Sequence, residues 1–295
     1  MTTTKSAANK KQSTVGGLVV VTGASSGIGR STARQLADDG YHVLAGVRKR
    51  VDAERLAADN LEPVLLDITD PAQVAAVADR VVQDPEGRPL RALVNNAGIA
   101  INAPVETLPL NEWRRQFEVG VFAQIAMIQA LLPALLAGRG RIIMIGSAGG
   151  KVAMPSFGAY SGAKFAMEAV SDALRREVEP LGVKVVVVIP GAMRTGMTAS
   201  GLGTATRLAD TMTPDQHARY DPLVRAYQAT VTSFEANGLP PDRAAAVITT
   251  AITTAKPRTR YTVGRDAAMM VLLARFVPDR VLDRVLRRQM RLGAT

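Results

Sequence analysis

The sequence predicts an α/β protein with a doubly wound parallel sheet, three layers deep, with helices covering both faces. Short runs rich in β-branched residues alternate with segments in which apolar residues recur at helical spacing. Such alternation is typical of parallel strands joined by right-handed helical crossovers. In addition, Gly23, Gly27 and Gly29 fall between the first strand-like run and the first helix-like segment.

Length and composition favour one large domain. The 295 residues, of which 47% are hydrophobic and 21% charged, are typical of a globular chain with a sizeable core. Residues 1–16 are polar, which predicts a flexible N-terminal arm before a single domain at 17–295. The absence of cysteine excludes disulfides, thiolate metal sites and a cysteine nucleophile. With only two histidines, His42 and His217, we predict no metal site and no histidine-based triad.

The net charge of +10 is concentrated at the two ends of the chain. Residues 1–14 hold three lysines and no acid, and residues 256–295 hold ten basic residues against three aspartates. No aromatic-rich basic patch accompanies this charge, so a nucleic-acid partner is not expected. Residues 1–14 also lack an apolar segment of the signal-peptide kind, and no apolar run reaches about 18 residues. We therefore expect a cytoplasmic protein.

The first half of the domain is expected to alternate strand and helix four times. Gly40 follows the first helix, where a left-handed C-cap suits glycine. Asp70 and Pro71 form a typical helix start. Pro133 is expected near the end of the fourth helix, which is long. The expected strands are 18–22, 41–47, 61–66 and 92–94, and the expected helices are 30–39, 51–60, 71–82 and 112–136.

The second half is expected to contain two more core strands and then a less regular region. The strands are 141–145 and 183–189, with a helix between them. Residues 196–240 are rich in Thr, Ala and Gly with unevenly spaced apolar residues, which predicts a flexible substrate loop with short helices. After it we expect a helix, a short strand and a helical extension broken near Pro278, at 240–255, 261–264 and 266–291.

Ser147, Tyr160 and Lys164 form a candidate catalytic group. Tyr160 and Lys164 are four residues apart in a helix-like segment, so they share one helix face. A neighbouring ammonium group favours phenolate, so we expect Lys164 to lower the pKa of Tyr160 and let it act as acid or base. Ser147 follows an apolar strand and is expected to donate a hydrogen bond to the oxygen that Tyr160 protonates. Taken alone, the pair would be better explained as ordinary surface residues of an amphipathic helix.

The glycine pattern decides between these interpretations. Gly23-x3-Gly27-x-Gly29 lies between a strand and a helix, the context that a dinucleotide-binding loop requires. Glycines allow the sharp turn and let a pyrophosphate approach the helix N-terminus, where free amides and the helix dipole favour anions. We therefore predict a dinucleotide site upstream of the candidate catalytic group.

Six motifs then complete a recognisable series: Thr22-Gly-Ala-Ser-Ser-Gly-Ile-Gly29, Asp67, Asn95-Asn-Ala-Gly98, Ser147, Tyr160-x3-Lys164 and Pro190-Gly-Ala-Met-Arg-Thr195. Over residues 17–195 the chain resembles the short-chain dehydrogenase/reductase (SDR) family in its non-extended branch. Two segments are also similar to retinol-type and 17β-hydroxysteroid-type dehydrogenases, namely Gly140-Arg-x4-Gly-Ser147 and Arg260-Tyr-Thr-Val-Gly264. The resemblance implies a Rossmann fold and an NAD(P)-dependent oxidoreductase that interconverts an alcohol and a ketone or aldehyde.

The resemblance also implies a role for each catalytic residue. Tyr160 would be the general acid in carbonyl reduction and the base in alcohol oxidation. Lys164 would lower the pKa of Tyr160 and bind the nicotinamide ribose, while Ser147 would hold and polarise the substrate oxygen. The cofactor carries the redox chemistry in such an enzyme, and the protein orients it.

Further residues are implied as cofactor contacts. Asp67 is expected to contact the adenine, Asn95 to line the cleft and Thr195 to meet the carboxamide. The end of the second strand reads Arg48-Lys-Arg50 with no acid before Asp52, and because arginine can pair with a 2′-phosphate we favour NADP over NAD. The expected cofactor set is Gly23, Ser25, Ser26, Gly27, Ile28, Gly29, Arg48, Asp67, Asn95, Ala97, Gly98, Tyr160, Lys164, Pro190, Gly191 and Thr195.

Gly120 departs from the family pattern. The helix after the fourth strand usually carries an asparagine that stabilises a helix irregularity and binds a water of the proton relay. Glycine supplies no side-chain amide, and in mid-helix it costs roughly 1 kcal/mol relative to alanine. Since glycine still permits a backbone irregularity, we expect activity to survive.

Several apolar residues flank the predicted site and suggest a bulky, lipophilic alcohol or carbonyl substrate, because adaptable methionines suit an apolar pocket. Each of them singly could equally pack the core. The expected substrate pocket is Ser147, Met154, Phe157, Met193 and Met197, with Leu202 nearby. Two other functions remain open: a non-catalytic dinucleotide-binding regulator, and an epimerase or dehydratase with tightly held nicotinamide.

A homo-oligomer, dimer or tetramer, is expected from the resemblance, with contacts through the helices at 112–136 and 157–177. The basic, apolar C-terminal run could lie on an anionic membrane surface. Packing against the fold or a sister subunit is the favoured interpretation, since apolar helix faces usually serve a core.

Overall fold

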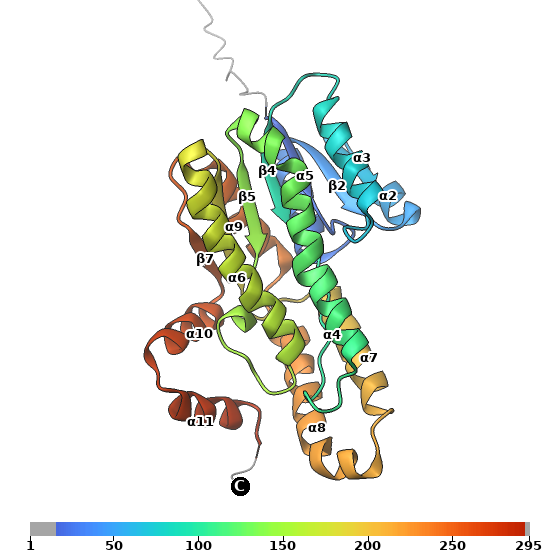
Figure 1. Ribbon diagram of the computed structural model, residues 1–295, viewed down its shortest axis with the longest axis vertical. Coiled ribbons are helices and arrows are strands. Elements are labelled where there is room, and N and C mark those ends of the chain that lie inside the picture. The colour runs from blue at the N-terminus through green and yellow to red at the C-terminus, as the bar shows by residue number, and fades with distance from the viewer. Residues whose placement is uncertain (1–15, 293–295) are drawn as a thin grey trace, which may run out of the picture.

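The protein is built around one parallel sheet, seen in a computed structural model that describes residues 16–292 (Figure 1). The expected arm falls on residues 1–16 and lies outside the described residues, Gly16 excepted. The sheet has seven strands in the order β3-β2-β1-β4-β5-β6-β7. The strands are β1 (Leu18–Val21), β2 (His42–Val47), β3 (Leu61–Leu65), β4 (Leu90–Asn95), β5 (Arg141–Ile145), β6 (Lys184–Pro190) and β7 (Arg260–Val263).

The strand order reverses between β1 and β4, and this confirms the doubly wound sheet. In register, Val20 of β1 pairs with Leu44 on one side and with Leu93 on the other. From β1 the chain winds outward to β3, and from β4 it winds outward the other way to β7. Because the crossovers diverge there, a crevice opens at the carboxyl ends of β1 and β4.

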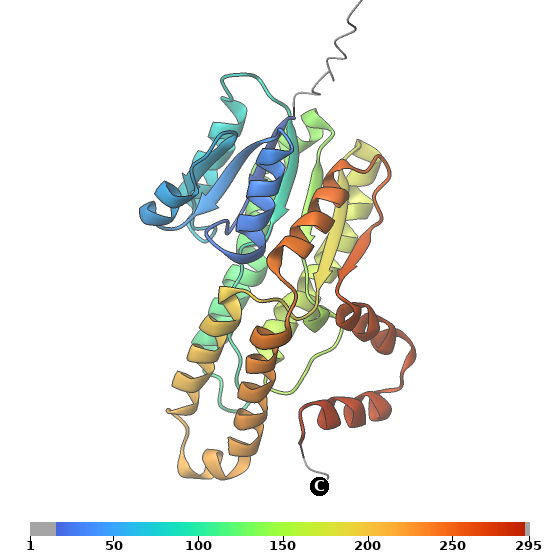
Figure 2. The same cartoon turned by 180° about the vertical axis from the view of Figure 1, so that it is seen from behind.

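Helices cover both faces of the sheet, as Figures 1 and 2 show from opposite sides. One core joins α3, α5 and α6 to the sheet, and a second core joins α1 and α9 to the other face. The helices are α1 (Gly27–Asp38), α2 (Arg50–Leu56), α3 (Pro71–Val82), α4 (Leu110–Phe117), α5 (Ala123–Gly138), α6 (Gly158–Val178), α7 (Gly196–Ala209), α8 (Pro214–Asn237), α9 (Pro241–Thr253), α10 (Arg265–Phe276) and α11 (Asp279–Gln289).

Local chemistry sets several helix ends where the sequence predicts them. The Asp70 side chain accepts hydrogen bonds from the backbone N–H groups of Ala72 and Gln73, and Pro71 occupies the first turn of α3. The helix expected at 51–60 ends earlier, at Leu56, because Ala58 forms a bridge to Leu61 and Asn60 adopts a positive φ of 59°.

The helix expected at 112–136 is interrupted. A π-helical turn, η1 (Glu118–Phe122), separates α4 from α5, and Gly120 lies in it. Glycine suits this place because a Cβ on Gly120 would meet the Cβ of Ala163 on α6 at 3.1 Å. The expected backbone irregularity is therefore present although the asparagine is not.

The combined run Leu110–Gly138 is also long and apolar enough, by length and composition, to cross a membrane. Core helices meet the same criterion, and α5 packs on the sheet with Met127, Leu131 and Leu135 fully buried. The core therefore accounts for part of the apolar character of the run.

Residues 196–240 differ most from expectation. Instead of a flexible loop with short helices, α7 and α8 form a long helical hairpin that projects beyond the sheet (Figures 1 and 2). Thr213 and Gln216 form a reciprocal capping box at the start of α8. The pattern was uneven because the hairpin buries only a few large side chains, among them Tyr227 and Val231.

The C-terminal extension agrees with expectation. It consists of α10 and α11, with the break at Pro278, which precedes the first residue of α11. Proline at this point ends the preceding helical run because it restricts the residue before it to extended backbone. Val277 accordingly has φ −99° and ψ 128°.

Candidate active site

A single large cavity of about 910 Å³ opens at the carboxyl ends of the central strands. It runs from the glycine loop after β1, across β4 and β5, to the segment between β6 and α7. The sequence-predicted residues that line it are Gly23, Ser25, Ser26, Gly27, Ile28, Arg48, Asp67, Ala97, Gly98, Ser147, Met154, Phe157, Tyr160, Lys164, Pro190, Gly191, Met193, Thr195 and Met197. Gly29 and Asn95 were expected there as well, but both are buried and neither is among the lining residues.

The glycine loop has the geometry of an anion cradle. Gly23 and Gly27 adopt positive φ values of 66° and 54°, which favour glycine. A Cβ on Gly29 would overlap the carbonyl oxygen of Gly23, so the third glycine allows α1 to pack against the loop. A Cβ on Gly27 would meet Thr195 at 3.2 Å. The amino end of α1 therefore faces the cavity, where its free amides fit a pyrophosphate group.

Asn95 does not line the cleft as expected, whereas the next residue, Asn96, does. Asn95 is fully buried, and its amide donates a 3.0 Å hydrogen bond to the backbone oxygen of Gln124, so its side chain does not line the cleft. Asn96 lines it instead and donates to the backbone oxygens of Thr22 and Gly23 at 2.9 and 3.2 Å. Asn96 thus ties the glycine loop to β4. Because two asparagines follow each other, the sequence alone does not indicate which side chain faces the cavity and which is buried in the core.

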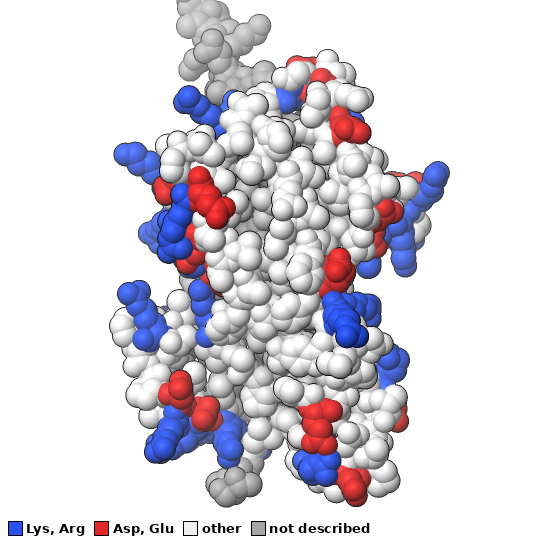
Figure 3. Space-filling view, viewed as in Figure 1, with Lys and Arg blue, Asp and Glu red and all other residues white. Residues whose placement is uncertain are grey.

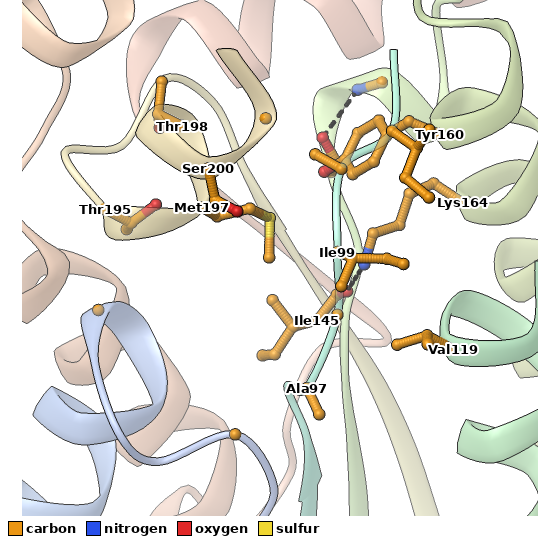
Figure 4. A pocket seen from close by; sticks show the side chains of 18 of the residues that line it. Ala97, Ile99, Val119, Ile145, Tyr160, Lys164, Thr195, Met197, Thr198 and Ser200 are labelled. Carbon is orange, nitrogen blue, oxygen red and sulfur yellow. Dashed lines mark hydrogen bonds between the residues drawn. The ribbon is translucent and has the colours of Figure 1, made fainter. Parts of the chain in front are cut away.

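Ser147, Tyr160 and Lys164 line the same cavity, as expected. Figure 4 shows Tyr160 and Lys164 side by side on α6. Ser147 follows β5 and accepts a 3.0 Å hydrogen bond from the backbone N–H of Gly149. Tyr160 and Lys164 lie one turn apart on α6, with the Lys164 Nζ 6.0 Å from the centre of the Tyr160 ring. The Lys164 Nζ donates a 2.7 Å hydrogen bond to the backbone oxygen of Ile145.

The electrostatics of this group differ from expectation. Burial raises the pKa of Tyr160, and the hydrogen bond with Ser147 opposes that effect only in part. Burial lowers the pKa of Lys164 from 10.5 to about 8, against the opposing charge of Glu168. The expected lowering of the Tyr160 pKa by Lys164 is therefore wrong for this structure, because the ammonium group is directed to Ile145 and desolvation dominates.

An ion cluster around the buried Glu168 lies one helical turn beyond Lys164, and sequence reasoning missed it. The Glu168 Oε2 accepts hydrogen bonds from the Nε and Nη2 of Arg260 at 3.0 and 2.8 Å, and Lys151 Nζ lies 2.8 Å from the same oxygen. Asp172 lies 3.0 Å from Arg260. The cluster anchors α6 to β7 and sets the position of the helix that carries Tyr160. The only signal was the recurrence of acids at helical spacing after Lys164.

Two glutamines on either side of Gly120 were also missed. Gln116 is buried, and its side-chain oxygen accepts a hydrogen bond from the N–H of Ile101 at 2.8 Å while its amide donates to Ile99 O at 3.1 Å. The Gln124 amide donates to Ala97 O at 3.0 Å. These amides hold the 97–101 segment of the cavity wall. A Cβ on Gly120 would meet the Gln116 Nε2 at 3.2 Å, so Gln116 occupies part of the space that a larger side chain there would need.

The opposite end of the cavity carries the residues expected to contact the adenosine. Burial tends to raise the pKa of Asp67, but hydrogen bonds from the N–H and hydroxyl of Thr69, together with the charge of Arg48, lower it overall. Of the three consecutive cations after β2, Arg48 alone lines the cavity among the described residues. The cavity thus has one negative side chain, Asp67, and one positive side chain, Arg48, at this end.

The C-terminal extension reaches the site. Asp266, in the first turn of α10, accepts a 2.7 Å hydrogen bond from the backbone N–H of Ala192 in the segment after β6. Met270 of α10 and Gln289 of α11 line the cavity at its open end. The helices at the end of the chain are therefore part of the cavity mouth.

The arrangement can move a proton at one defined place. A phenol that burial keeps protonated lies beside a serine hydroxyl, and both face a cavity large enough for a dinucleotide and a second molecule. The glycine cradle and the Arg48–Asp67 end fit a dinucleotide by geometry and by chemistry. No group of three or more His, Cys, Asp or Glu side chains suited to a metal occurs among residues 16–292.

Comparison with known sequences assigns the chain to a family. The sequence model described as short chain dehydrogenase matches residues 17–203. The chain belongs to the short chain dehydrogenase family. As a short chain dehydrogenase, it is an NAD(P)-dependent oxidoreductase that acts between alcohols and carbonyl compounds.

Two curated relatives and one solved structure illustrate the similarity of this short chain dehydrogenase to others. It is 33% identical over 274 residues to an NADPH-dependent 3-dehydrocapnine reductase of Ornithobacterium rhinotracheale, covering 90% of this chain and 94% of that protein. It is 37% identical over 279 residues to retinol dehydrogenase 5 of Mus musculus, covering 91% and 87%. A short chain dehydrogenase from Burkholderia cenocepacia, solved in complex with NADP, superimposes with a TM-score of 0.70 at 26% identity, covering 95% of this chain and 98% of the other.

Proposed function

We propose that this short chain dehydrogenase uses NADP to interconvert a bulky, lipophilic alcohol and its carbonyl compound. One observation carries the proposal: the Ser147–Tyr160–Lys164 group and an apolar wall line the same cavity of about 910 Å³. That wall contains Met154, Phe157, Met193 and Met197.

Ser147, Tyr160 and Lys164 would each have a distinct role in the reaction. Bound NADP(H) supplies the redox chemistry. The Ser147 hydroxyl holds the substrate oxygen, and the Tyr160 hydroxyl gives it a proton in reduction and takes one in oxidation. Because burial raises the pKa of Tyr160, the phenol stays protonated near neutral pH, which suits the acid role. Lys164 keeps a cation close to the phenol at pH values below about 8.

The preference for NADP rests on Arg48. This side chain lines the cavity next to Asp67, where an arginine can pair bidentately with a 2′-phosphate. The similarity to an NADPH-dependent reductase and to a dehydrogenase solved with NADP supports the same choice.

The lipophilic substrate is supported by flexible apolar side chains on both sides of the site. Met197 reaches from α7 towards the wall that carries Tyr160 (Figure 4). Phe157 lies edge-on to Tyr160 and tilted against Tyr227, with ring centres 6.5 and 5.2 Å apart, and adds aromatic surface. The relative named retinol dehydrogenase 5 acts, by its name, on a lipophilic alcohol.

We further propose that the protein is a homo-oligomer through α5 and α6 and acts in the cytoplasm. Figure 3 shows the face over α5 with almost no charged side chains. Phe122 of η1 and Phe165 of α6 are exposed. Apolar, charge-poor faces of this kind are typical of interfaces between subunits. Sedimentation equilibrium tests the oligomer, and cell fractionation tests the location.

The decisive experiment follows absorbance of the reduced cofactor. NADPH and NADH are each presented with long-chain, cyclic and polyol carbonyl compounds, and the oxidised cofactors with the matching alcohols. We expect turnover with NADPH and lipophilic compounds, at a kcat/KM at least tenfold above that with NADH. Turnover restricted to small polar sugars contradicts the substrate class. Cofactor binding without turnover favours the regulator, and product without net cofactor change favours the epimerase.

A further inference from the structure

The two C-terminal helices expose apolar side chains that the rest of the described chain does not cover. Met269, Leu272 and Phe276 recur on one face of α10, and Val281 and Val285 recur on α11; all five are 39% to 70% exposed. The sequence favoured packing of these helices against the fold or a sister subunit. Within the described chain, the buried residues of these two helices are Ala267 of α10 and Leu286 of α11. Packing against the fold therefore covers only a minor part of each helix.

Arginines lie directly beside the exposed valines of α11. Val281, Arg284, Val285 and Arg288 are spaced three and four residues apart and therefore form one continuous helix surface. Arg280, Arg284 and Arg288 are exposed and form no ion pair within residues 16–292. Figure 3 shows basic side chains gathered over this helix at the lower left. A surface of this composition combines apolar contact with positive charge.

The same helices border the cavity. Met270 and Gln289 line its mouth, and Asp266 ties α10 to Ala192 beside the catalytic group. Figures 1 and 2 show α10 and α11 together at one corner of the molecule, next to the carboxyl end of β7. Whatever binds the exposed surface of α10 and α11 therefore lies next to residues that line the cavity.

We infer that α10 and α11 form an interfacial surface that binds an anionic lipid bilayer in the plane of its headgroups. Exposed Leu, Met and Phe with flanking arginines are the composition of such surfaces, since apolar side chains enter the headgroup boundary while arginines pair with lipid phosphates. A second copy of the chain fits less well. Residues 265–292 hold seven arginines against three aspartates, so two such surfaces facing each other would repel.

This inference goes beyond the proposed oxidoreductase activity and does not depend on it. It does add a consequence: a lipophilic compound dissolved in the bilayer would lie beside the cavity mouth. The test therefore measures binding to lipid, not turnover.

Co-sedimentation of the full-length protein with vesicles is the test. Vesicles of phosphatidylcholine alone are compared with vesicles that also contain phosphatidylglycerol, at low and at high salt. We expect binding to the anionic vesicles that weakens as salt is added, and binding to neutral vesicles at least about tenfold weaker. Equal binding to both kinds of vesicle, or to neither, overturns the inference without need of any variant.

Two variants and a matched control locate the surface. Leu272→Asp with Phe276→Asp removes apolar contact, and Arg280→Gln with Arg284→Gln and Arg288→Gln removes charge. Each is expected to lower anionic-vesicle binding by about tenfold or more. The control is Val82→Asp, at a valine of α3 that is 78% exposed on another part of the surface, and it should bind as the wild type does. Circular dichroism and NADPH binding confirm that each variant is folded.

The competing occupant, a second copy, has its own signature. If the surface were an oligomer interface, Leu272→Asp with Phe276→Asp would change the sedimentation coefficient in the absence of lipid, and anionic vesicles would not bind the wild type. That pair of results overturns the inference. An unchanged sedimentation coefficient with lost vesicle binding supports it.

Discussion

The nucleotide region, residues 17–195, and the substrate region, residues 196–292, are built on different principles. At the glycine loop of the first, backbone segments approach so closely that side chains are excluded, since a Cβ on Gly29 would overlap Gly23; in α7 of the second, a Cβ on Gly203 would meet nothing within 4 Å. Among the described residues, the buried charged side chains Asp84, Lys164 and Glu168 all lie in the first region. The first region thus holds fixed geometry and buried charges, whereas the second adds helices over the cavity, with Met197 among its lining residues. Four experiments test that contrast.

The largest effect should come from paired tyrosines, one from each region. Tyr160→Phe removes the hydroxyl that donates the proton, and turnover should fall by about 10²- to 10⁴-fold while NADPH still binds. Tyr227→Phe removes a hydroxyl of α8 that accepts a 3.2 Å hydrogen bond from Asn102, and it should alter KM more than kcat. Steady-state kinetics and fluorescence titration of NADPH measure both. Equal losses of kcat in the two variants would contradict the proposed difference between the nucleotide region and the substrate region.

The second effect is a pH dependence of stability that originates in the first region. Lys164 has its pKa lowered from 10.5 to about 8, so between these pH values the unfolded chain binds more protons than the folded one. The free energy of unfolding should therefore rise as pH increases from 8 to 10, by about 2 kcal/mol from this group. Below pH 8 the cost of the buried charge is present in full.

Urea denaturation at pH 7, 8, 9 and 10 measures this rise. In Lys164→Met the rise should disappear, because the titrating group is absent. Tyr160, whose pKa is raised by burial, contributes stability that is lost only above pH 10, outside this window. A wild-type profile as flat as that of Lys164→Met would show that the ammonium group is not desolvated as described.

The third effect compares the glycines directly. Gly29→Ala forces the start of α1 away from the loop and should destabilise the fold by about 1 to 3 kcal/mol, with weaker NADPH binding. Gly203→Ala, in an open position of α7, should instead stabilise by up to about 1 kcal/mol. Thermal and urea unfolding report both. Similar signs for the two substitutions would contradict the difference in backbone packing.

The smallest effect is expected from two arginine substitutions, one in each region. Arg48→Gln should raise the KM for NADPH by about tenfold and leave that for NADH nearly unchanged, since only the phosphorylated cofactor loses an ion pair. Arg207 on α7 pairs with Glu112 at 3.4 Å on the surface, and Arg207→Gln should change neither. An equal loss for NADPH and NADH in Arg48→Gln would argue against selection by the 2′-phosphate.

Local sequence patterns determined much of the first region. Strands such as 141–145 are short apolar runs, and the Asp70-Pro71 start of α3 is local chemistry, so each could be predicted without knowledge of its neighbours. The spacing of Tyr160 and Lys164 placed both on one face of α6, because helical periodicity depends only on the chain itself. The glycine loop could be predicted for the same reason: its positive φ angles are a property of those residues.

Only tertiary packing decided the rest. It turned Asn96 rather than Asn95 towards the cavity, and it raised rather than lowered the pKa of Tyr160, because desolvation depends on everything that surrounds the phenol. It stabilised α7 and α8 as a hairpin through a few long-range contacts that leave no regular apolar pattern. It also brought α10 and α11, from the far end of the chain, to the mouth of a cavity whose glycine cradle begins at Gly23. Burial and long-range contact are collective quantities, and no single segment of the sequence contains them.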